Sequence, residues 1–297
     1  MSVYWLAVFK AAGKNWLASQ AFIYAAALAF FTVFSIAPVV ILVVALLGLF
    51  LGEDVARAEL MGQLEAALGA QAMSAVETAI QNSQIEDRRI GPMLAGFAAT
   101  ALGATTVFVQ MQQSLNQIWD VAARPSKNSL WLLIKARLLS LTMVLSLGFI
   151  LLVSLLLGVV VRAIMAHADQ WLPLPSWLVL GFEPVIALAV VTLLFAAIFR
   201  ILPDVVLRWK DVLAGAFITA LLFTLGRSLI AWYLANTAAA SAYGAAGSLV
   251  LLLLWVNYSS LILLLGASIC RAHLEARGIP IQPRNTAVRV HRALIEE

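Results

Sequence analysis

The chain has 297 residues, of which 63% are hydrophobic and 11% charged, and its mean hydropathy is +0.97. Soluble domains average roughly 45–50% apolar and about 25% charged residues. A soluble fold of this length could not hide so much apolar surface, and disordered chains are poor in apolar residues. The composition excludes both classes and predicts an all-α, polytopic membrane protein.

The first twenty residues contain Lys10 and Lys14 within a mildly amphipathic stretch. They lack the ordered charged, apolar and small-residue regions of a cleavable secretory signal. We expect residues 1–20 to form a cytoplasmic helix on the membrane surface, because aromatic side chains anchor such helices at the interface. The expected anchors are Trp5, Phe9 and Trp16.

Six stretches are long and apolar enough to span a bilayer, which takes about 20 residues. They cover residues 21–51, 91–114, 138–161, 177–199, 212–235 and 244–269. Of the 19 Lys and Arg residues, 14 fall on the side of the N-terminus, the loops 120–137 and 200–211 and the tail 270–297. Four fall on the other side, and Arg227 lies within a span. Basic residues mark the cytoplasmic side, so we expect both termini inside.

The loop 52–90 is the largest segment expected outside the cytoplasm. It carries seven acidic residues, and Leu60, Leu64 and Leu68 recur at the spacing of an amphipathic helix. Two short helices joined near Gly69 would form a small cap on the six-span domain 21–269. A ligand-gating role for this cap is the alternative to simple packing.

The tail 270–297 predicts a polar, basic cytoplasmic extension. Arg284, Arg289 and Arg292 are expected to face anionic lipid headgroups, each contributing about 1 kcal/mol near the surface. We expect no nucleic-acid partner, because no aromatic residues that could stack on bases are interleaved with these charges. The single cysteine, Cys270, cannot form an intramolecular disulfide.

Several polar or helix-breaking residues within the spans are candidates for a transport route. Pro38 removes a helix hydrogen bond, and it predicts either a simple kink or a hinge lining a cavity, with Ser35 nearby. Gln110, Gln113 and Gln117 share one face at the end of the second span. That face is either an interfacial collar or the inner mouth of a passage. The candidate route comprises Ser35, Pro38, Gln110, Gln113, Asn116, Gln117, Glu183, Arg227 and Asn257.

Glu183 and Arg227 lie at similar predicted depths in the fourth and fifth spans. An unpaired charge in the membrane costs at least ~2.5–3.5 kcal/mol, which favours an ion pair. The alternatives are Glu183 at the headgroups, where Pro184 could start the helix, and an Arg227 side chain that reaches the outer surface. Asn257 near the middle of the sixth span needs hydrogen-bond partners, whereas the small residues near Gly244 are typical of helix packing.

Sequence motifs of nucleotide and metal enzymes are missing. The sequence contains no P-loop, GxGxxG or GxSxG pattern, and its three histidines are far apart. We therefore expect no enzyme activity, no metal site and no cofactor.

A set of short motifs follows one order along nearly the whole chain, and this ordered set resembles the YihY/BrkB family of membrane proteins. The resemblance implies a six-helix bacterial inner-membrane protein with links to virulence or to lipid or solute export. The name ribonuclease BN that some members have carried looks like a misassignment. The motifs are Ala27–Phe31 through Ser35 and Pro38, Ser114–Trp119, Arg200–Pro203 with Trp209 and Gly215, Tyr233–Leu234, and Tyr243–Ser248 with Trp255 and Gly266.

The sequence thus predicts a transporter that works without ATP and moves a small or amphipathic, anionic solute. An envelope scaffold or virulence-associated assembly factor without a substrate is the alternative. A ribonuclease is a distant third reading, since it would need a metal-dependent site.

Overall fold

The computed structural model describes residues 2–68, 73, 76–78, 80, 90–124, 176–236 and 247–290. Helices cover most of these residues, as an all-α fold requires, and long helices occupy five of the six predicted spans. The predicted third span, 138–161, lies outside the described residues. The helices are α1 (Ser2–Ala18), α2 (Ala21–Leu51), α3 (Glu53–Leu68), α5 (Ile90–Ile118), α7 (Ser176–Ile201), α8 (Trp209–Asn236) and α10 (Gly247–Ala276).

Three of these helices are long and apolar enough to cross a membrane by length and composition. The apolar segments are Ala21–Ile41 of α2, Trp209–Leu229 of α8 and Leu249–Ala276 of α10, while Ala187–Ile201 of α7 is a shorter one. The number of six spans and the orientation of the termini stay predictions.

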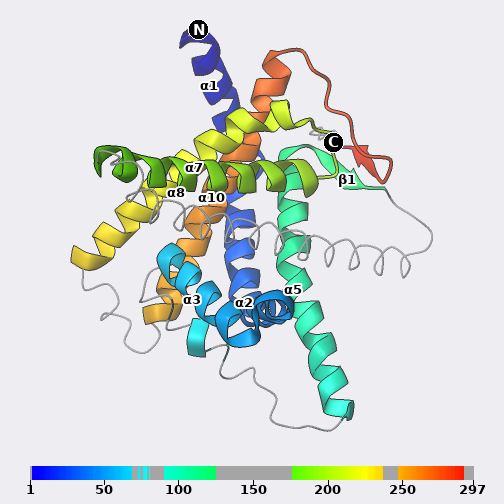
Figure 1. Cartoon of the computed structure of the whole chain (residues 1–297). Coiled ribbons are helices and arrows are strands. Elements are labelled where there is room, and N and C mark those ends of the chain that lie inside the picture. The colour runs from blue at the N-terminus through cyan, green and yellow to red at the C-terminus, as the bar shows by residue number, and fades with distance from the viewer. Residues whose placement is uncertain are drawn as a thin grey trace.

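Helix α10 lies at the centre of the packing and contacts α1, α2, α5 and α8 (Figure 1). Further contacts join α2 to α5 and α7 to α8. The largest apolar cluster combines α2, α5, α7, α8 and α10, with Leu115, Trp119, Phe199 and Leu264 fully buried. Helix α1 runs beside the C-terminal part of α10.

The interface between α8 and α10 is built from small residues. A Cβ added to Gly266 of α10 would collide with the side chain of Thr219 and come within 2.9 Å of Phe199. A Cβ on Gly215 of α8 would lie 3.0 Å from the Gly266 carbonyl oxygen, and one on Gly226 would overlap the ring of Tyr258. The two helices therefore run antiparallel at very close range, which is how helices associate in apolar surroundings.

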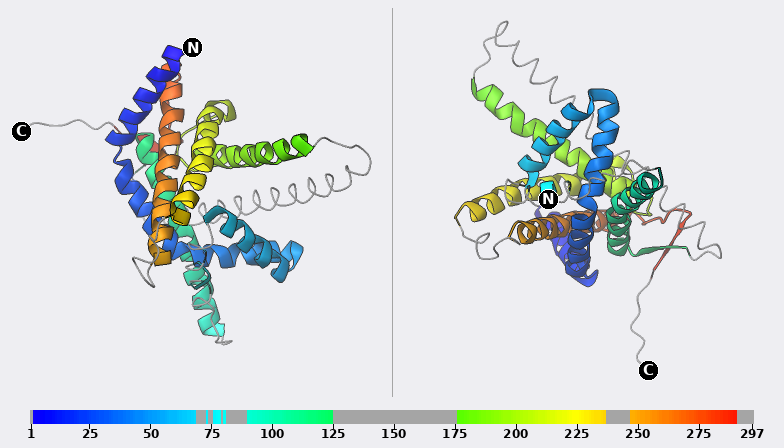
Figure 2. Two further views of the ribbon diagram at one scale, coloured as in Figure 1. Left: turned by 90° about the vertical axis from the view of Figure 1, so that its left-hand side faces the viewer. Right: turned by 90° about the horizontal axis from the view of Figure 1, so that it is seen from below.

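Helix α2 continues through Pro38 and bends partway along its length (Figure 2). A proline inside a helix removes a backbone donor and favours such a bend. The Pro38 ring packs on Gly103 of α5, where a Cβ would come within 2.9 Å of the proline Cγ. The predicted kink is thus accommodated by a glycine on the neighbouring helix, and its role as a hinge stays a prediction.

The predicted cap helix is present as α3, which packs against α2. Leu60 is buried and Leu64 half-buried in a cluster with α2 and Leu252 of α10. Three further helical residues of the 52–90 segment are buried in the same cluster, namely Met73, Val76 and Ile80. The amphipathic pattern predicted this packing correctly for the described part of the segment.

Two short strands, β1 (Val121–Ala123) and β2 (Ala287–Arg289), form an antiparallel pair. Val121 lies opposite Arg289, and Ala123 lies opposite Ala287. A further isolated bridge joins Val205 to Pro283. The segment after α10 is therefore fastened to two connecting loops, which the sequence did not predict (Figure 1).

Candidate functional site

The four segments expected on the cytoplasmic side meet at one end of the structure. Residues of α1, the end of α5, the α7–α8 connection and the chain after α10 all exchange hydrogen bonds there. We call this region the polar end. Its side chains form two clusters, one around Arg271 and one around Asp204.

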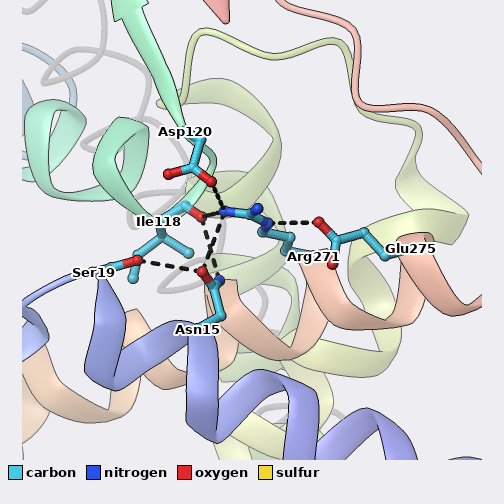
Figure 3. A network of polar contacts seen from close by, with 6 residues as sticks. All are labelled: Asn15, Ser19, Ile118, Asp120, Arg271 and Glu275. Atoms are coloured by element: carbon cyan, nitrogen blue, oxygen red, sulfur yellow. Dashed lines mark hydrogen bonds and ion pairs between the residues drawn. The ribbon is translucent and has the colours of Figure 1, made fainter. Parts of the chain in front are cut away.

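Arg271 of α10 joins three parts of the chain (Figure 3). Its Nη1 lies 2.7 Å from Asp120 Oδ2, and it also donates to the Ile118 carbonyl oxygen at 2.6 Å and to Asn15 Oδ1 at 3.2 Å. Its Nε donates to Glu275 Oε1 at 2.8 Å. The Arg271 side chain is only 12% exposed. This one guanidinium therefore fixes the end of α5 and the end of α1 against α10.

Local backbone geometry presents the Asp120 carboxylate to Arg271. Helix α5 ends at Ile118, and Asp120 follows with a φ of 49°, in the left-handed region. Asp tolerates this conformation better than most residues. The chain then turns directly into β1, so the ion pair marks the junction between helix and strand.

Asp204, in the connection between α7 and α8, binds two amides of α5. Asn116 Nδ2 donates to Asp204 Oδ2 at 2.8 Å, and the Asp204 backbone N–H donates to Asn116 Oδ1 at 2.8 Å. Gln112 Nε2 donates to Asp204 Oδ1 at 3.2 Å. The backbone N–H of Arg284 donates to the Asp204 carbonyl oxygen at 2.8 Å. The cluster thus connects α5, the α7–α8 connection and the tail.

Arg284 caps the C-terminus of α7. Its Nη2 donates to the carbonyl oxygens of Arg200 at 3.1 Å and Ile201 at 3.2 Å. Helix ends leave carbonyl groups without partners inside the helix, and a cation there also interacts favourably with the helix dipole. The Arg284 side chain thus binds a helix end, and its contact with lipid headgroups stays a prediction. Arg289 is exposed on β2, and Arg292 lies outside the described residues.

Two of the expected membrane anchors of α1, Trp5 and Trp16, contact α10. Trp5 stacks on His273 with ring centroids 5.5 Å apart, and Tyr4 Oη shares a hydrogen bond of 3.0 Å with His273 Nδ1. Trp16 Nε1 donates to the Leu261 carbonyl oxygen at 3.2 Å. Trp5 and Trp16 are half-buried and Phe9 is exposed, and the anchoring of all three at the membrane interface stays a prediction.

The residues of the candidate route lie in different surroundings. Ser35 of α2 is buried, and the Asn116 side chain is hydrogen-bonded to Asp204. Gln110 and Gln117 are half-buried and Gln113 is exposed. The α5 face that binds Asp204 is a different one, which carries Gln112 and Asn116.

The remaining candidates lie on α7, α8 and α10. The side chain of Glu183 lies outside the described residues, so its pairing with Arg227 stays a prediction. The Arg227 side chain is exposed on α8, and Asn257 is half-buried on α10. The contact between Gly226 and Tyr258 brings Arg227 and Asn257 to the same level of the two helices.

Within the described residues, no group of three His, Cys, Asp or Glu side chains could hold a metal ion. The charged residues of the two clusters, Arg271, Asp120, Glu275 and Asp204, are bound to one another, to amide side chains or to backbone groups. Sequence reasoning had not singled out Gln112, Asp120, Asp204 or Arg271 as members of a site. The only sequence signal was the spacing of Gln112 and Asn116, which places both on one face of α5.

Comparisons with known proteins agree with the helical, apolar architecture. The family profile described as virulence factor BrkB matches residues 12–289. The ribonuclease-like protein YfkH of Bacillus subtilis is 29% identical over 253 residues, covering 82% of this chain and 86% of the relative. A UPF0761 membrane protein of Mannheimia succiniciproducens is 28% identical over 251 residues, covering 82% of each chain.

A longer UPF0761 membrane protein of Xanthomonas oryzae is 28% identical over 273 residues, which is 90% of this chain and 60% of the relative. No solved structure matches. The profile covers nearly the whole chain and the motifs that carried the resemblance, and the long apolar helices fit the membrane proteins among its relatives. This chain is an integral membrane protein of the BrkB family.

Proposed function

We propose that the protein is a carrier, not an enzyme, that moves a small or amphipathic anionic solute across the bacterial inner membrane without ATP. In this proposal both termini are cytoplasmic and the polar end faces the cytoplasm. The observation that carries it is the close contact between Gly226 of α8 and Tyr258 of α10, because this contact places a cationic and an amide side chain at one level within two apolar helices.

The antiparallel register of α8 and α10 supports the position of this site. Gly215 lies against Cys270, and Gly226 lies against Tyr258. Eleven residues along α8 therefore correspond to about twelve along α10 in the opposite direction. Arg227 thus lies at the level of Asn257 and Tyr258, well away from the polar end.

Helix α2 borders the same region from the other side of α10. Val33 and Ile36 of α2 and Val256 of α10 pack against one apolar cluster. Ser35, which lies between Val33 and Ile36 in the sequence, is buried, and Asn257 directly follows Val256. This cluster joins α2 to the part of α10 that directly precedes Asn257.

The charge of Arg227 suggests the sign of the solute. A cationic side chain within the membrane costs at least ~2.5–3.5 kcal/mol, and such residues commonly bind substrates or line ion pathways. The positive charge of Arg227 would attract an anionic group of the solute. Ion pairs that connect segments at the polar end, such as Arg271 with Asp120, would then have to break for release to the cytoplasm.

Access to the proposed site can be measured with a cysteine probe. In a Cys270→Ala background, Asn257→Cys would be treated with a membrane-impermeant maleimide in vesicles of each orientation. We expect labelling from at least one side, and no labelling of the matched control Leu264→Cys, because Leu264 is fully buried on the same helix. Protection of Asn257→Cys from both sides would overturn the proposal and favour a scaffold without a substrate.

Transport itself can be tested with proteoliposomes and a bacterial metabolite extract, with mass spectrometry of the vesicle contents. Wild-type vesicles should accumulate one or more anionic compounds over empty vesicles. We expect Arg227→Gln to reduce this accumulation at least tenfold and Arg227→Lys to retain part of it, because the lysine keeps the positive charge. Equal accumulation by Arg227→Gln and wild type would contradict the assigned role of Arg227.

A further inference from the structure

Helix α8 presents two chemically opposite faces. Its packed face consists of small residues, with Gly215, Ala216 and Ala220 buried against neighbouring helices. The other face is a stripe of large, exposed apolar side chains at a spacing of four residues. We call it the α8 stripe, and it comprises Trp209, Leu213, Phe217, Leu221, Leu225 and Leu229.

In a membrane protein this distribution indicates which face meets lipid. Close helix contacts use small residues, and large apolar residues do not need protein partners where acyl chains surround them. Phe217 is 46% exposed and Leu229 is 65% exposed, although both belong to a helix long enough to span the bilayer. The stripe therefore offers a surface along which an acyl chain can lie.

Basic side chains gather where the stripe reaches the α7–α8 connection. The Arg200 guanidinium lies 4.6 Å from the centre of the Trp209 ring, and its Nε donates to the Leu207 carbonyl oxygen. Lys210 is exposed beside Trp209, and the Arg208 side chain is 74% exposed. We call this group the α7–α8 corner, and it comprises Arg200, Arg208, Trp209 and Lys210.

Of the two acidic residues nearest in sequence to the corner, Asp211 pairs with Arg208 and Asp204 is bound by side chains of α5. Asp211 is buried, accepts from the Arg208 backbone N–H at 3.1 Å and pairs with Arg208 Nε at 3.2 Å. Asp204 is bound by the amides of Asn116 and Gln112. Among the described residues, neither Arg200 nor Lys210 forms a salt bridge, so the corner keeps a net positive charge.

We propose that the α7–α8 corner binds the headgroup of an anionic phospholipid whose acyl chains lie along Leu213 and Phe217. Lys210 and Arg200 contact the phosphate, and Trp209 lies at the glycerol level, where tryptophan side chains concentrate in membranes. A purely apolar occupant would leave the basic side chains without a partner, and a soluble anion would leave the stripe uncovered. The lipid matches both surfaces, and its binding does not depend on transport.

Lipid titration of the detergent-solubilised full chain tests this assignment by its thermal unfolding curve. We expect phosphatidylglycerol to raise the unfolding temperature in a saturable manner and phosphatidylcholine to have little effect. Lys210→Gln should weaken the apparent affinity about fivefold, the usual contribution of one basic residue at an anionic surface. Arg277→Gln is the matched control, because Arg277 is an exposed basic residue directly after α10 and outside the corner. This variant should bind phosphatidylglycerol like wild type.

The acyl half of the site needs its own pair of variants. Phe217→Ala should weaken phosphatidylglycerol binding, whereas Leu229→Ala, at the far end of the same stripe, should leave it unchanged. Soluble glycerol 3-phosphate should not reproduce the stabilisation. The proposal is overturned by unchanged affinity in Lys210→Gln, by equal weakening in Arg277→Gln, or by glycerol 3-phosphate acting as well as the lipid.

Discussion

The polar end and the α8–α10 interface hold helices together in different ways. At the α8–α10 interface, the Thr219 hydroxyl donates to the Gly215 carbonyl oxygen of its own helix at 2.6 Å. At the polar end, by contrast, Arg271 and Asn116 bond to groups on other elements. The hydroxyl thus bonds within its own helix in the first region, where the Cys270 thiol also contacts the Val212 carbonyl oxygen of α8 at 3.6 Å, whereas charged and amide side chains connect separate segments in the second.

This difference follows from the surroundings that each region is built for. In hydrocarbon, water cannot serve as a hydrogen-bond partner, so a hydroxyl that bonds its own helix is already satisfied. Helix association there depends on close packing of small residues. At the polar end the connecting loops carry backbone groups that need partners, and long side chains such as Arg271 and Arg284 supply them. Steric and polar substitutions should therefore affect the two regions differently.

The largest effect is expected for Gly266→Leu. Even a Cβ at this position would collide with Thr219 and approach Phe199, so α8 and α10 would have to separate. We expect the free energy of unfolding to fall by about 3 kcal/mol, measured by unfolding with SDS from mild detergent micelles. Gly62→Leu in α3 is the control, because nothing lies within 4 Å of a Cβ there. Equal losses in both variants would show that the interface is not closely packed.

Arg271→Gln should have the next largest effect, because it removes contacts to α1, α5 and Glu275 together. Hydrogen bonds to charged groups contribute about 1.5–3 kcal/mol, and the partial exposure of Asp120 and Glu275 reduces this. We expect a loss of about 2 kcal/mol in the same unfolding assay. Arg277→Gln should change stability by less than about 0.5 kcal/mol. A neutral Arg271→Gln would mean that the cluster adds no stability.

A smaller loss is expected for Asn116→Ala, which removes the donor to Asp204 Oδ2 and the acceptor of the Asp204 backbone N–H, while Gln112 still donates to Asp204 Oδ1. The expected decrease in unfolding free energy is about 1–2 kcal/mol, whereas Gln113→Ala on the exposed face of α5 should be nearly neutral. Asp204→Ala should then cost less in the Asn116→Ala background than in wild type. Strict additivity of the two substitutions would argue that the pair is not coupled.

The smallest effect should be a gain, from Gly13→Ala in α1. Nothing lies within 4 Å of a Cβ at Gly13, and the residue is within a helix. Alanine restricts the unfolded chain more than glycine does, so we expect stabilisation of about 0.4–1 kcal/mol. A loss of stability would reveal close packing of α1 at this position that the structure does not have.

The sequence predicted the helices well and the contacts between their ends poorly. Long apolar runs predicted α2, α8 and α10, and the leucine spacing predicted α3, because periodicity reports directly on a buried face. The chain after Gly278 was expected to be a polar, basic extension, and nothing in its sequence indicated that it would pair with β1 or that Arg284 would cap α7. Strand pairs of three residues leave too short a pattern to recognise in one sequence.

The sequence identified some polar residues of the candidate site, but it did not predict which residues they bind. Asn116 was chosen from a run of amides, and its bond to Asp204 depends on the packing of two segments far apart in the chain. Arg271 was counted only as one of the basic residues that orient the protein. Side-chain pairing between distant segments requires the tertiary arrangement, which no local spacing encodes.

The pairing of β1 with β2 has a consequence for how the protein is made. Chains are synthesised from the N-terminus, and β2 follows every described helix. The ladder, together with the Arg284 cap on α7, can therefore close only after α10 has left the ribosome. Its closure is a late step in biogenesis, so ribosome-stalled chains that end before Ala287 should remain more sensitive to protease around residues 121–123 than chains that extend beyond Arg289.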